Sequence, residues 1–178
     1  MRIIAGKLKG RKIIAPKNLP VRPTTDMAKE GLFNILSHRI HLPSTKLLDL
    51  YSGIGSISLE FFSRGGKDIT SVDGNYGCIK FLQTKSDEFE ADITCLKSDV
   101  FQFLANHKSS YDLIFADPPY IYSKEEFQQL VELVFSNQLL QEDGLFILEH
   151  PKHTDLSDID KFSESRKYGN SVFSFFTN

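Results

Sequence analysis

Residues 111–120 read Tyr-Asp-Leu-Ile-Phe-Ala-Asp-Pro-Pro-Tyr, and this stretch decides the fold. It begins as an apolar run with β-branched and aromatic side chains, which is typical of a strand buried in a parallel sheet. Pro118 and Pro119 cannot extend a strand, because proline has no backbone N–H and a fixed φ. The chain must therefore leave the sheet at Asp117, at the carboxyl edge where open α/β sheets bind ligands.

The residues that end this strand suit an amino group. The Asp117 carboxylate and the Pro118 carbonyl are two acceptors in a stiff frame, and an exocyclic amine of guanine or adenine offers two N–H donors. Tyr120 adds a face for base stacking, worth about 1–3 kcal/mol per base. A plain strand-to-loop turn is the alternative. The motif resembles the Asp/Asn-Pro-Pro-Tyr/Phe motif of S-adenosylmethionine-dependent amino methyltransferases, which implies that the catalytic residues are Asp117, Pro118, Pro119 and Tyr120.

The composition is that of an ordinary globular protein. The chain has 178 residues, 40% hydrophobic and 25% charged, which is enough for one well-buried core. No apolar run approaches the roughly eighteen residues of a membrane span, and no signal-peptide core is present. Cys78 and Cys95 form no Cys-x-x-Cys pair, and His150 and His153 lie in a predicted loop. We therefore expect a cytoplasmic monomer with no membrane segment and no metal site.

Basic residues are concentrated at the start of the chain. Residues 1–22 hold seven Lys and Arg side chains and no acid, although the whole chain has a net charge of −2. The strand-like runs 2–5 and 12–15 flank a segment rich in glycine and lysine, which predicts a β-hairpin with a cationic tip. We expect this hairpin to contact RNA phosphates; the alternative is a hairpin that only packs on the core. The candidate RNA-binding residues are Lys7, Lys9, Arg11, Lys12 and Arg22.

A helix is predicted after the proline-rich connector 16–23. The sequence Thr24-Thr25-Asp26 offers N-cap residues, and apolar positions with helical spacing follow at Ala28, Leu32, Ile35 and Leu36. We expect this helix to cover the rim of a cofactor site. At its start, Arg22, Thr24, Thr25 and Asp26 either reach ligand or RNA or only cap the helix.

Residues 46–64 predict a strand, a glycine loop and a helix, which is a nucleotide-binding layout. Glycines let the backbone pass close to a ligand. The third small position of the dinucleotide fingerprint is occupied by Ser58. Asp49 lies four positions before Gly53, and a carboxylate so close to the loop would repel the pyrophosphate of a dinucleotide. The pattern Asp-x-x-x-Gly-x-Gly resembles the first methyltransferase motif, which implies that Asp49 meets the amino end of the methionine moiety. The candidate cofactor residues here are Asp49, Tyr51, Ser52, Gly53 and Gly55.

Two further acids follow predicted strands. Asp73 ends the strand 69–73 and lies twenty positions after Gly53, where an acid accepts hydrogen bonds from ribose hydroxyls. The alternative interpretation of Asp73 is an aspartate in a surface turn. Asp99 follows the strand 93–97 and matches the acid that contacts the adenine amine in this fold; its alternative is to cap the next helix. Val100 or Phe101 is expected to line the adenine pocket.

The remaining segments complete an α/β pattern. A capping box at Ser123 and Glu126 opens a helix, residues 144–150 form a strand, and a terminal hairpin turns at Gly169-Asn170. Alternating strands and helices predict a Rossmann-like, doubly wound, seven-stranded and mostly parallel sheet whose last strand is antiparallel. We expect residues 1–43 to form a basic hairpin-and-helix extension and residues 44–178 to form the Rossmann-like domain.

With these segments placed, nearly the full length resembles the bacterial family that methylates a guanine N2 in small-subunit (16S) ribosomal RNA. The specific motifs are N-terminal, namely Met1-Arg2-Ile3-Ile4-Ala5-Gly6, Arg22-Pro23-Thr24-Thr25-Asp26 and Lys29-Glu30-x-Leu32-Phe33-Asn34. Asp73 replaces a more usual glutamate and Tyr120 replaces a more usual phenylalanine. The resemblance implies S-adenosylmethionine as cofactor and small-subunit ribosomal RNA, naked or in the assembled subunit, as partner. Adenine-N6 methylation is the nearest alternative, and an NAD-dependent oxidoreductase is a more distant one.

Overall fold

Strand β4 (Tyr111–Ala116) lies in the middle of a seven-stranded sheet with the order β3-β2-β1-β4-β5-β7-β6. The computed structural model describes residues 1–20 and 24–178. The five neighbouring strands β3, β2, β1, β4 and β5 are all parallel to one another. Strand β7 pairs antiparallel with both β5 and β6, which confirms the predicted sheet. The other strands are β1 (Lys46–Leu50), β2 (Asp68–Asp73), β3 (Ile93–Lys97), β5 (Leu140–Pro151), β6 (Phe162–Tyr168) and β7 (Ser171–Phe176). Strand β5 begins before the predicted Gly144 because Leu140 pairs with Tyr111.

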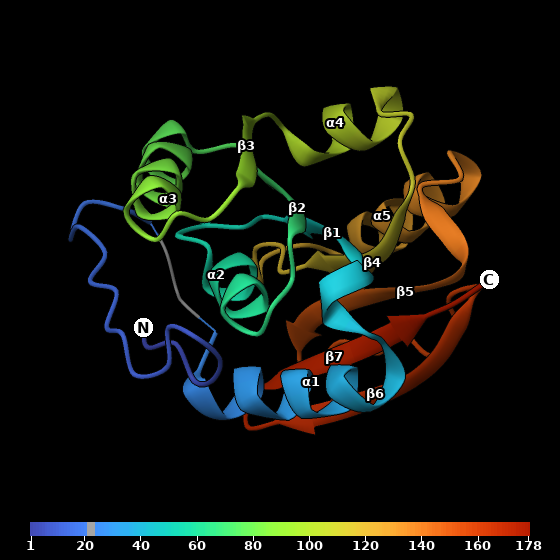
Figure 1. The fold of residues 1–178 in the computed structure, drawn as a ribbon. Coiled ribbons are helices and arrows are strands. Elements are labelled where there is room, and N and C mark those ends of the chain that lie inside the picture. The colour runs from blue at the N-terminus through green and yellow to red at the C-terminus, as the bar shows by residue number, and fades with distance from the viewer. Residues whose placement is uncertain (21–23) are drawn as a thin grey trace.

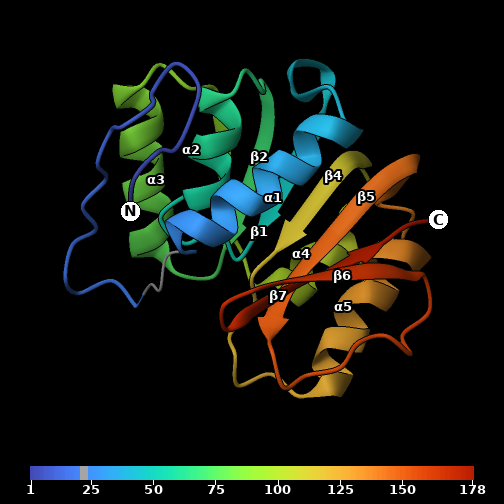
Figure 2. The ribbon, with the colours of Figure 1, turned by 90° about the horizontal axis from the view of Figure 1, so that it is seen from below.

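Helices cover both faces of the sheet (Figures 1 and 2), as a doubly wound fold requires. One hydrophobic cluster packs α1, α2 and α3 on the first face, and a second packs α4 and α5 on the other. The helices are α1 (Asp26–Arg39), α2 (Ser56–Ser63), α3 (Tyr76–Glu88), α4 (Val100–Asn106) and α5 (Lys124–Ser136), with a 3-10 turn at Leu42–Ser44. No helix among the described residues is long and apolar enough to cross a membrane.

The predicted helix caps are present. The Thr25 hydroxyl accepts from the Ala28 N–H at 3.2 Å and opens α1. Ser123 and Glu126 form the predicted capping box of α5. Because these caps satisfy backbone donors that a helix leaves unpaired, they fix where each helix starts beside the carboxyl edge of the sheet.

The N-terminal hairpin is shorter than predicted. Arg2 and Lys12 form a single antiparallel bridge, and no strand extends from it. The physical reason is a side chain from another element: the Glu60 carboxylate of α2 accepts from the N–H groups of Ile4 (2.8 Å) and Ala5 (3.0 Å). The predicted strand 2–5 thus bonds to a carboxylate instead of extending a ladder.

A buried ion network ties this segment to the core. Lys29 of α1 and Glu60 are both fully buried with their charged atoms 3.5 Å apart, and Arg64 donates to Glu60 at 2.8 Å. Lys29 also donates to the Arg2 carbonyl at 2.6 Å. Burial lowers the pKa of Lys29, whereas Glu60 opposes that shift. Since an unpaired buried charge is costly, these partners hold the N-terminal segment, α1 and α2 together.

The cationic tip of the hairpin packs on the end of α2. The Ser63 carbonyl accepts from the Lys7 N–H at 2.8 Å, and the Ser63 hydroxyl accepts from the Leu8 N–H at 2.9 Å. The Lys7 ammonium lies 3.6 Å from the centre of the Phe62 ring. Lys7, Lys9, Arg11 and Lys12 are exposed, and Arg22 lies outside the described residues. The glycine loop precedes α2, so the tip and the loop are separated by about 12 Å, the length of this helix.

Candidate functional site

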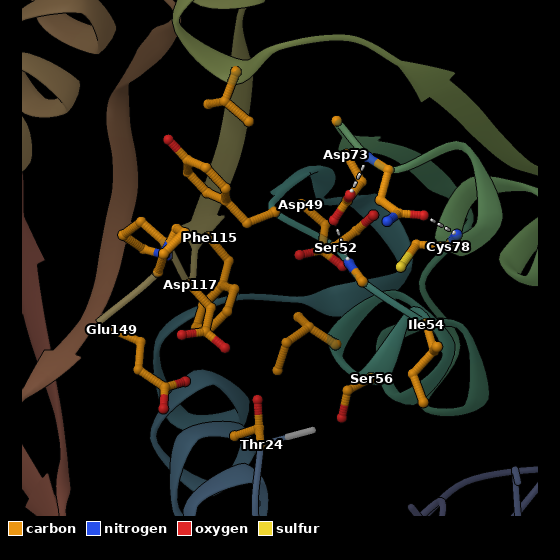
Figure 3. Close-up of a pocket in the computed structure, with 18 of the residues that line it drawn as sticks. Thr24, Asp49, Ser52, Ile54, Ser56, Asp73, Cys78, Phe115, Asp117 and Glu149 are labelled. Atoms are coloured by element: carbon orange, nitrogen blue, oxygen red, sulfur yellow. Dashed lines mark hydrogen bonds between the residues drawn. The ribbon is translucent and has the colours of Figure 1, made fainter. Parts of the chain in front are cut away.

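A cavity of about 480 Å³ opens at the carboxyl edge of the sheet (Figure 3). That volume lies within the usual range of small-molecule sites. It brings together eleven residues that the sequence selected: Asp49, Tyr51, Ser52, Gly53, Asp73, Asp99, Val100, Asp117, Pro118, Pro119 and Tyr120. Two predicted cofactor residues, Gly55 and Phe101, are not among its lining residues. The predicted cofactor and catalytic segments therefore share one site.

The loop between β1 and α2 is a left-handed turn held by Asp73. The backbone φ angles are +56° at Tyr51, +53° at Gly53 and +81° at Gly55. The Asp73 carboxylate accepts from the Gly53 N–H at 2.9 Å and from the Asn75 N–H at 2.7 Å. A Cβ at Gly55 would lie 2.3 Å from a Leu82 methyl, so this glycine is needed for packing rather than for lining the cavity. A carboxylate has about four acceptor positions, which leaves Asp73 capacity for a ligand hydroxyl.

Asp49 is a buried acid at the end of β1. Its side chain accepts from the N–H of Ser58 at 3.1 Å and from the hydroxyl of Ser58 at 2.5 Å. Burial raises the pKa of Asp49 to about 7, and the nearby charge of Asp73 adds to that rise, whereas the Ser58 hydrogen bonds lower it. Ser58, which replaces the third glycine of the dinucleotide fingerprint, thus holds this carboxyl group. A cation in the cavity would favour its ionised form.

Two buried hydroxyls in the cavity have no hydrogen-bond partner among residues 1–20 and 24–178. The Oγ atoms of Ser52 and Ser56 make no hydrogen bond within the described part of the chain. Both residues line the cavity, and Figure 3 shows the Ser56 side chain extending into it. Buried polar groups are almost always hydrogen-bonded, so these two hydroxyls indicate a polar ligand. Sequence analysis selected Ser52 and missed Ser56.

The segment after β3 divides between the cavity and the core. Asp99 accepts from the Gln102 N–H at 2.9 Å and caps α4, which confirms the capping interpretation. Asp99 and Val100 also line the cavity. The Phe101 ring instead stacks on Tyr122, with centroids 6.0 Å apart, and packs against the second hydrophobic cluster. Of the two residues expected at an adenine pocket, only Val100 lies in the cavity.

The Asp-Pro-Pro-Tyr segment leaves the sheet as predicted. The Asp117 N–H makes the last bond to β1, to the Leu50 carbonyl at 3.4 Å, and the Pro119 carbonyl accepts from the Tyr122 N–H at 3.0 Å. The Tyr120 hydroxyl lies 2.8 Å from the Ser171 hydroxyl and donates to Glu149 at 3.2 Å. Burial raises the pKa of Tyr120 to about 12, with contributions from neighbouring carboxylates. Tyr120 is therefore a neutral, half-buried ring that is held by its hydroxyl.

Sequence analysis missed the residues that close the cavity opposite the glycine loop. Glu149 lies within the buried part of β5, and Ser171 begins β7. In Figure 3, Glu149 and Asp117 lie on the same side of the cavity and Thr24 lies at its lower edge. The signal that could have found Glu149 is an acid directly after the apolar run Leu145–Leu148, at the same edge as Asp117.

Comparison with known proteins agrees with this geometry. Residues 1–177 match the family model described as Conserved hypothetical protein 95. The ribosomal RNA small subunit methyltransferase D of Haemophilus influenzae is 32% identical over 161 residues, which cover 88% of this chain and 81% of that protein.

Solved structures share the fold. A hypothetical protein of Thermus thermophilus has a TM-score of 0.85 at 24% identity and covers 100% of this chain and 99% of its own. The 16S rRNA N2 G1207 methyltransferase of Thermus thermophilus, in complex with AdoMet and guanosine, has a TM-score of 0.72 at 19% identity over 90% of this chain and 45% of its own. The predicted Rossmann-like, doubly wound fold is thus confirmed. The chain belongs to the Conserved hypothetical protein 95 family and is a relative of the ribosomal RNA small subunit methyltransferases D.

Proposed function

We propose that this protein is an S-adenosylmethionine-dependent methyltransferase that modifies the exocyclic N2 amine of a guanine in small-subunit ribosomal RNA. The observation that carries the proposal is one cavity in which Asp117, Pro118 and Tyr120 lie beside the glycine loop and Asp49. The relative from Haemophilus influenzae, which is named as a small-subunit ribosomal RNA methyltransferase, supports the substrate class.

The cavity fits S-adenosylmethionine by the chemistry of its side chains. Asp49 is a buried carboxyl group suited to the ammonium of the methionine moiety, and Asp73 has acceptor capacity for ribose hydroxyls. Asp99 and Val100 offer an acceptor and an apolar surface to the adenine. The unpartnered hydroxyls of Ser52 and Ser56 would gain partners from the same ligand. An NAD-dependent oxidoreductase would leave the Asp-Pro-Pro-Tyr segment without a role.

The reaction requires that a weakly nucleophilic amine be aimed at an electrophile. When bound, S-adenosylmethionine supplies an activated methyl group on its sulfonium. Asp117 and the Pro118 carbonyl accept hydrogen bonds from the two N–H groups of the target amine, which orients its nitrogen. The Tyr120 ring stacks on the base after that base has left its stack in the RNA. Such positioning can supply roughly 7–11 kcal/mol of a barrier. The Asp117 carboxylate also stabilises positive charge as it develops on nitrogen.

The exposed cations of the hairpin would contact RNA outside the cavity. Lys and Arg supply the sequence-independent part of RNA affinity through phosphates. The tip packs on Ser63, about one α2 length from the glycine loop. We therefore infer that Lys7, Lys9, Arg11 and Lys12 contact RNA that flanks the target nucleotide.

Labelled-methyl transfer tests this function. Wild-type protein is incubated with labelled S-adenosylmethionine and small ribosomal subunits, naked ribosomal RNA or duplex DNA, and the methylated nucleosides are identified by mass spectrometry. N2-methylguanosine from subunits or RNA is expected, whereas methyladenine from DNA would contradict the proposal. Asp117→Ala should lower the transfer rate by about 10²–10³-fold or more while cofactor affinity stays near that of wild type. Asp143→Ala, an exposed acid of β5, is the matched control.

A further inference from the structure

The cavity contains a second carboxylate beside the proposed amine-binding motif. Ala116 of β4 pairs with Leu148 of β5, so Asp117 and Glu149 follow at neighbouring positions of adjacent parallel strands. Adjacent strands lie about 4.8 Å apart. Glu149 is only 3% exposed, and it lines the same cavity as Asp117 (Figure 3). A planar base held by Asp117 would therefore have an edge within reach of Glu149.

The atoms beside the reacting amine distinguish guanine from adenine. In guanine, the N2 amine is next to N1–H, which is a donor. In adenine, the N6 amine is next to an unprotonated N1, which is an acceptor. An ionised carboxylate only accepts hydrogen bonds. Glu149 in this form complements the guanine edge and repels the adenine edge, although Asp-Pro-Pro-Tyr alone suits both amines.

We propose that Glu149 is the residue that determines base specificity: its carboxylate accepts from N1–H of the target guanine while Asp117 and Pro118 hold the N2 amine. This inference rests on the proposed function. Specificity of this kind combines attraction for one base with repulsion of the other.

A hydrogen bond from Tyr120, which is itself in contact with Ser171, helps to hold Glu149 in place for this role. The Tyr120 hydroxyl donates to its Oε1 at 3.2 Å, and the Ser171 hydroxyl lies 2.8 Å from the Tyr120 oxygen. Tyr120 therefore connects its own ring, the proposed stacking surface, to Glu149, the residue proposed to contact the edge of the base. Side chains held by packing and hydrogen bonds discriminate better than mobile ones, because little movement can accommodate the wrong base.

The test compares RNAs that differ only at the target nucleotide. Mass spectrometry first locates the guanosine that wild-type protein methylates. Ligated synthetic RNA then carries guanosine, adenosine or 2-aminopurine riboside there. 2-Aminopurine keeps the N2 amine but has an acceptor at N1 and lacks O6, so the comparison of wild type with Glu149→Gln on this base isolates the contact assigned to Glu149. Rates are measured as kcat/KM for wild type, Glu149→Gln and the control Glu142→Gln, which changes an exposed glutamate on the same strand.

Wild type should prefer guanosine to 2-aminopurine by at least about 100-fold, because the wrong base leaves a buried carboxylate facing an acceptor. Glu149→Gln should reduce this ratio at least tenfold, since its amide can donate to N1, whereas Glu142→Gln should leave the ratio unchanged. Glu149→Gln should keep the melting temperature of wild type and still bind S-adenosylmethionine, which separates lost specificity from misfolding.

Two results are distinguishable failures. If wild type methylates guanosine but Glu149→Gln keeps the full preference over 2-aminopurine, the role of Glu149 is overturned and the proposed function stands. If wild type transfers no methyl group to any guanosine of the small-subunit RNA, the proposed function itself is refuted, and this inference with it.

Discussion

The affinity for S-adenosylmethionine should fall sharply below pH 7 because of Asp49. Burial raises the pKa of this carboxyl group from its ordinary value of 3.8 to about 7. An α-ammonium group stays charged below about pH 8. If Asp49 must be ionised to pair with that ammonium, binding below pH 7 requires loss of a proton. Each pH unit then costs about 1.4 kcal/mol, so Kd at pH 5.5 should be about 30-fold higher than its plateau value.

Titration calorimetry between pH 5.5 and 7.5 can measure this slope. S-adenosylhomocysteine should show the same slope, because it keeps the amino end and lacks only the sulfonium charge. Methylthioadenosine, which lacks the amino-acid part, should bind with an affinity that does not change with pH, as should S-adenosylmethionine with Asp49→Asn. A pH-independent Kd for S-adenosylmethionine with wild type, or an equal slope with methylthioadenosine, would refute the pairing.

The same carboxyl group should lower the stability of the free protein at neutral pH. Its pKa is higher in the folded state, so the folded chain binds the proton more tightly, and the free energy of unfolding falls as pH rises from about 4 to about 7. With a shift from 3.8 to about 7, the loss is up to about 4 kcal/mol. Asp49→Asn should therefore raise the melting temperature at pH 8 while it weakens cofactor binding. An unchanged or lower melting temperature at pH 8 would contradict this assignment.

Two other perturbations test the N-terminal segment. Glu60→Ala should destabilise the fold by about 3–5 kcal/mol, because it leaves the buried Lys29 charge unpaired; at about 2–4 °C per kcal/mol the melting temperature should fall by about 10 °C. Glu30→Ala, an exposed acid of α1, is the control, and an equal shift in both variants would argue against the network. Changing the four tip cations to alanine should weaken RNA binding. It should also reduce the slope of log K for RNA binding against log[salt] by up to about three. An unchanged slope would mean that the hairpin only packs on the core. These cations are Lys7, Lys9, Arg11 and Lys12.

The parts of the site that sequence analysis predicted are encoded locally. The Asp-Pro-Pro-Tyr segment carries its own strand end, because prolines stop the ladder wherever the strand lies. The glycine loop likewise needs only a short stretch of backbone with positive φ, as seen at Gly53 and Gly55. The spacing of Asp73 predicted an acceptor for ribose hydroxyls, and the structure shows its carboxylate lining the cavity and bonded to the Gly53 N–H.

The parts that were missed depend on pairing between distant segments. Glu149 reaches the cavity because β5 pairs with β4, and Ser171 reaches it because β7 pairs with β5. No spacing within the sequence encodes either register. The prediction for the N-terminal hairpin extended its strands too far for the same reason, since Glu60 of the distant helix α2 accepts from the N–H groups of Ile4 and Ala5. At the start of α4, Val100 and Phe101 are equally apolar, and only the orientation of the helix decides that Val100 lines the cavity.

The charge distribution of the chain follows from what enters the cavity and what stays outside. A polyanionic RNA would be repelled by an acidic site, yet five carboxyl groups line this one. The groups that enter are a cationic cofactor and a base without charge, and both present donors to carboxylates. The phosphates must then be met elsewhere, and the exposed hairpin cations Lys7, Lys9, Arg11 and Lys12 are the proposed source of that charge. An acidic cavity also binds the sulfonium cofactor better than its uncharged thioether product, which favours product release after transfer. These carboxyl groups belong to Asp49, Asp73, Asp99, Asp117 and Glu149.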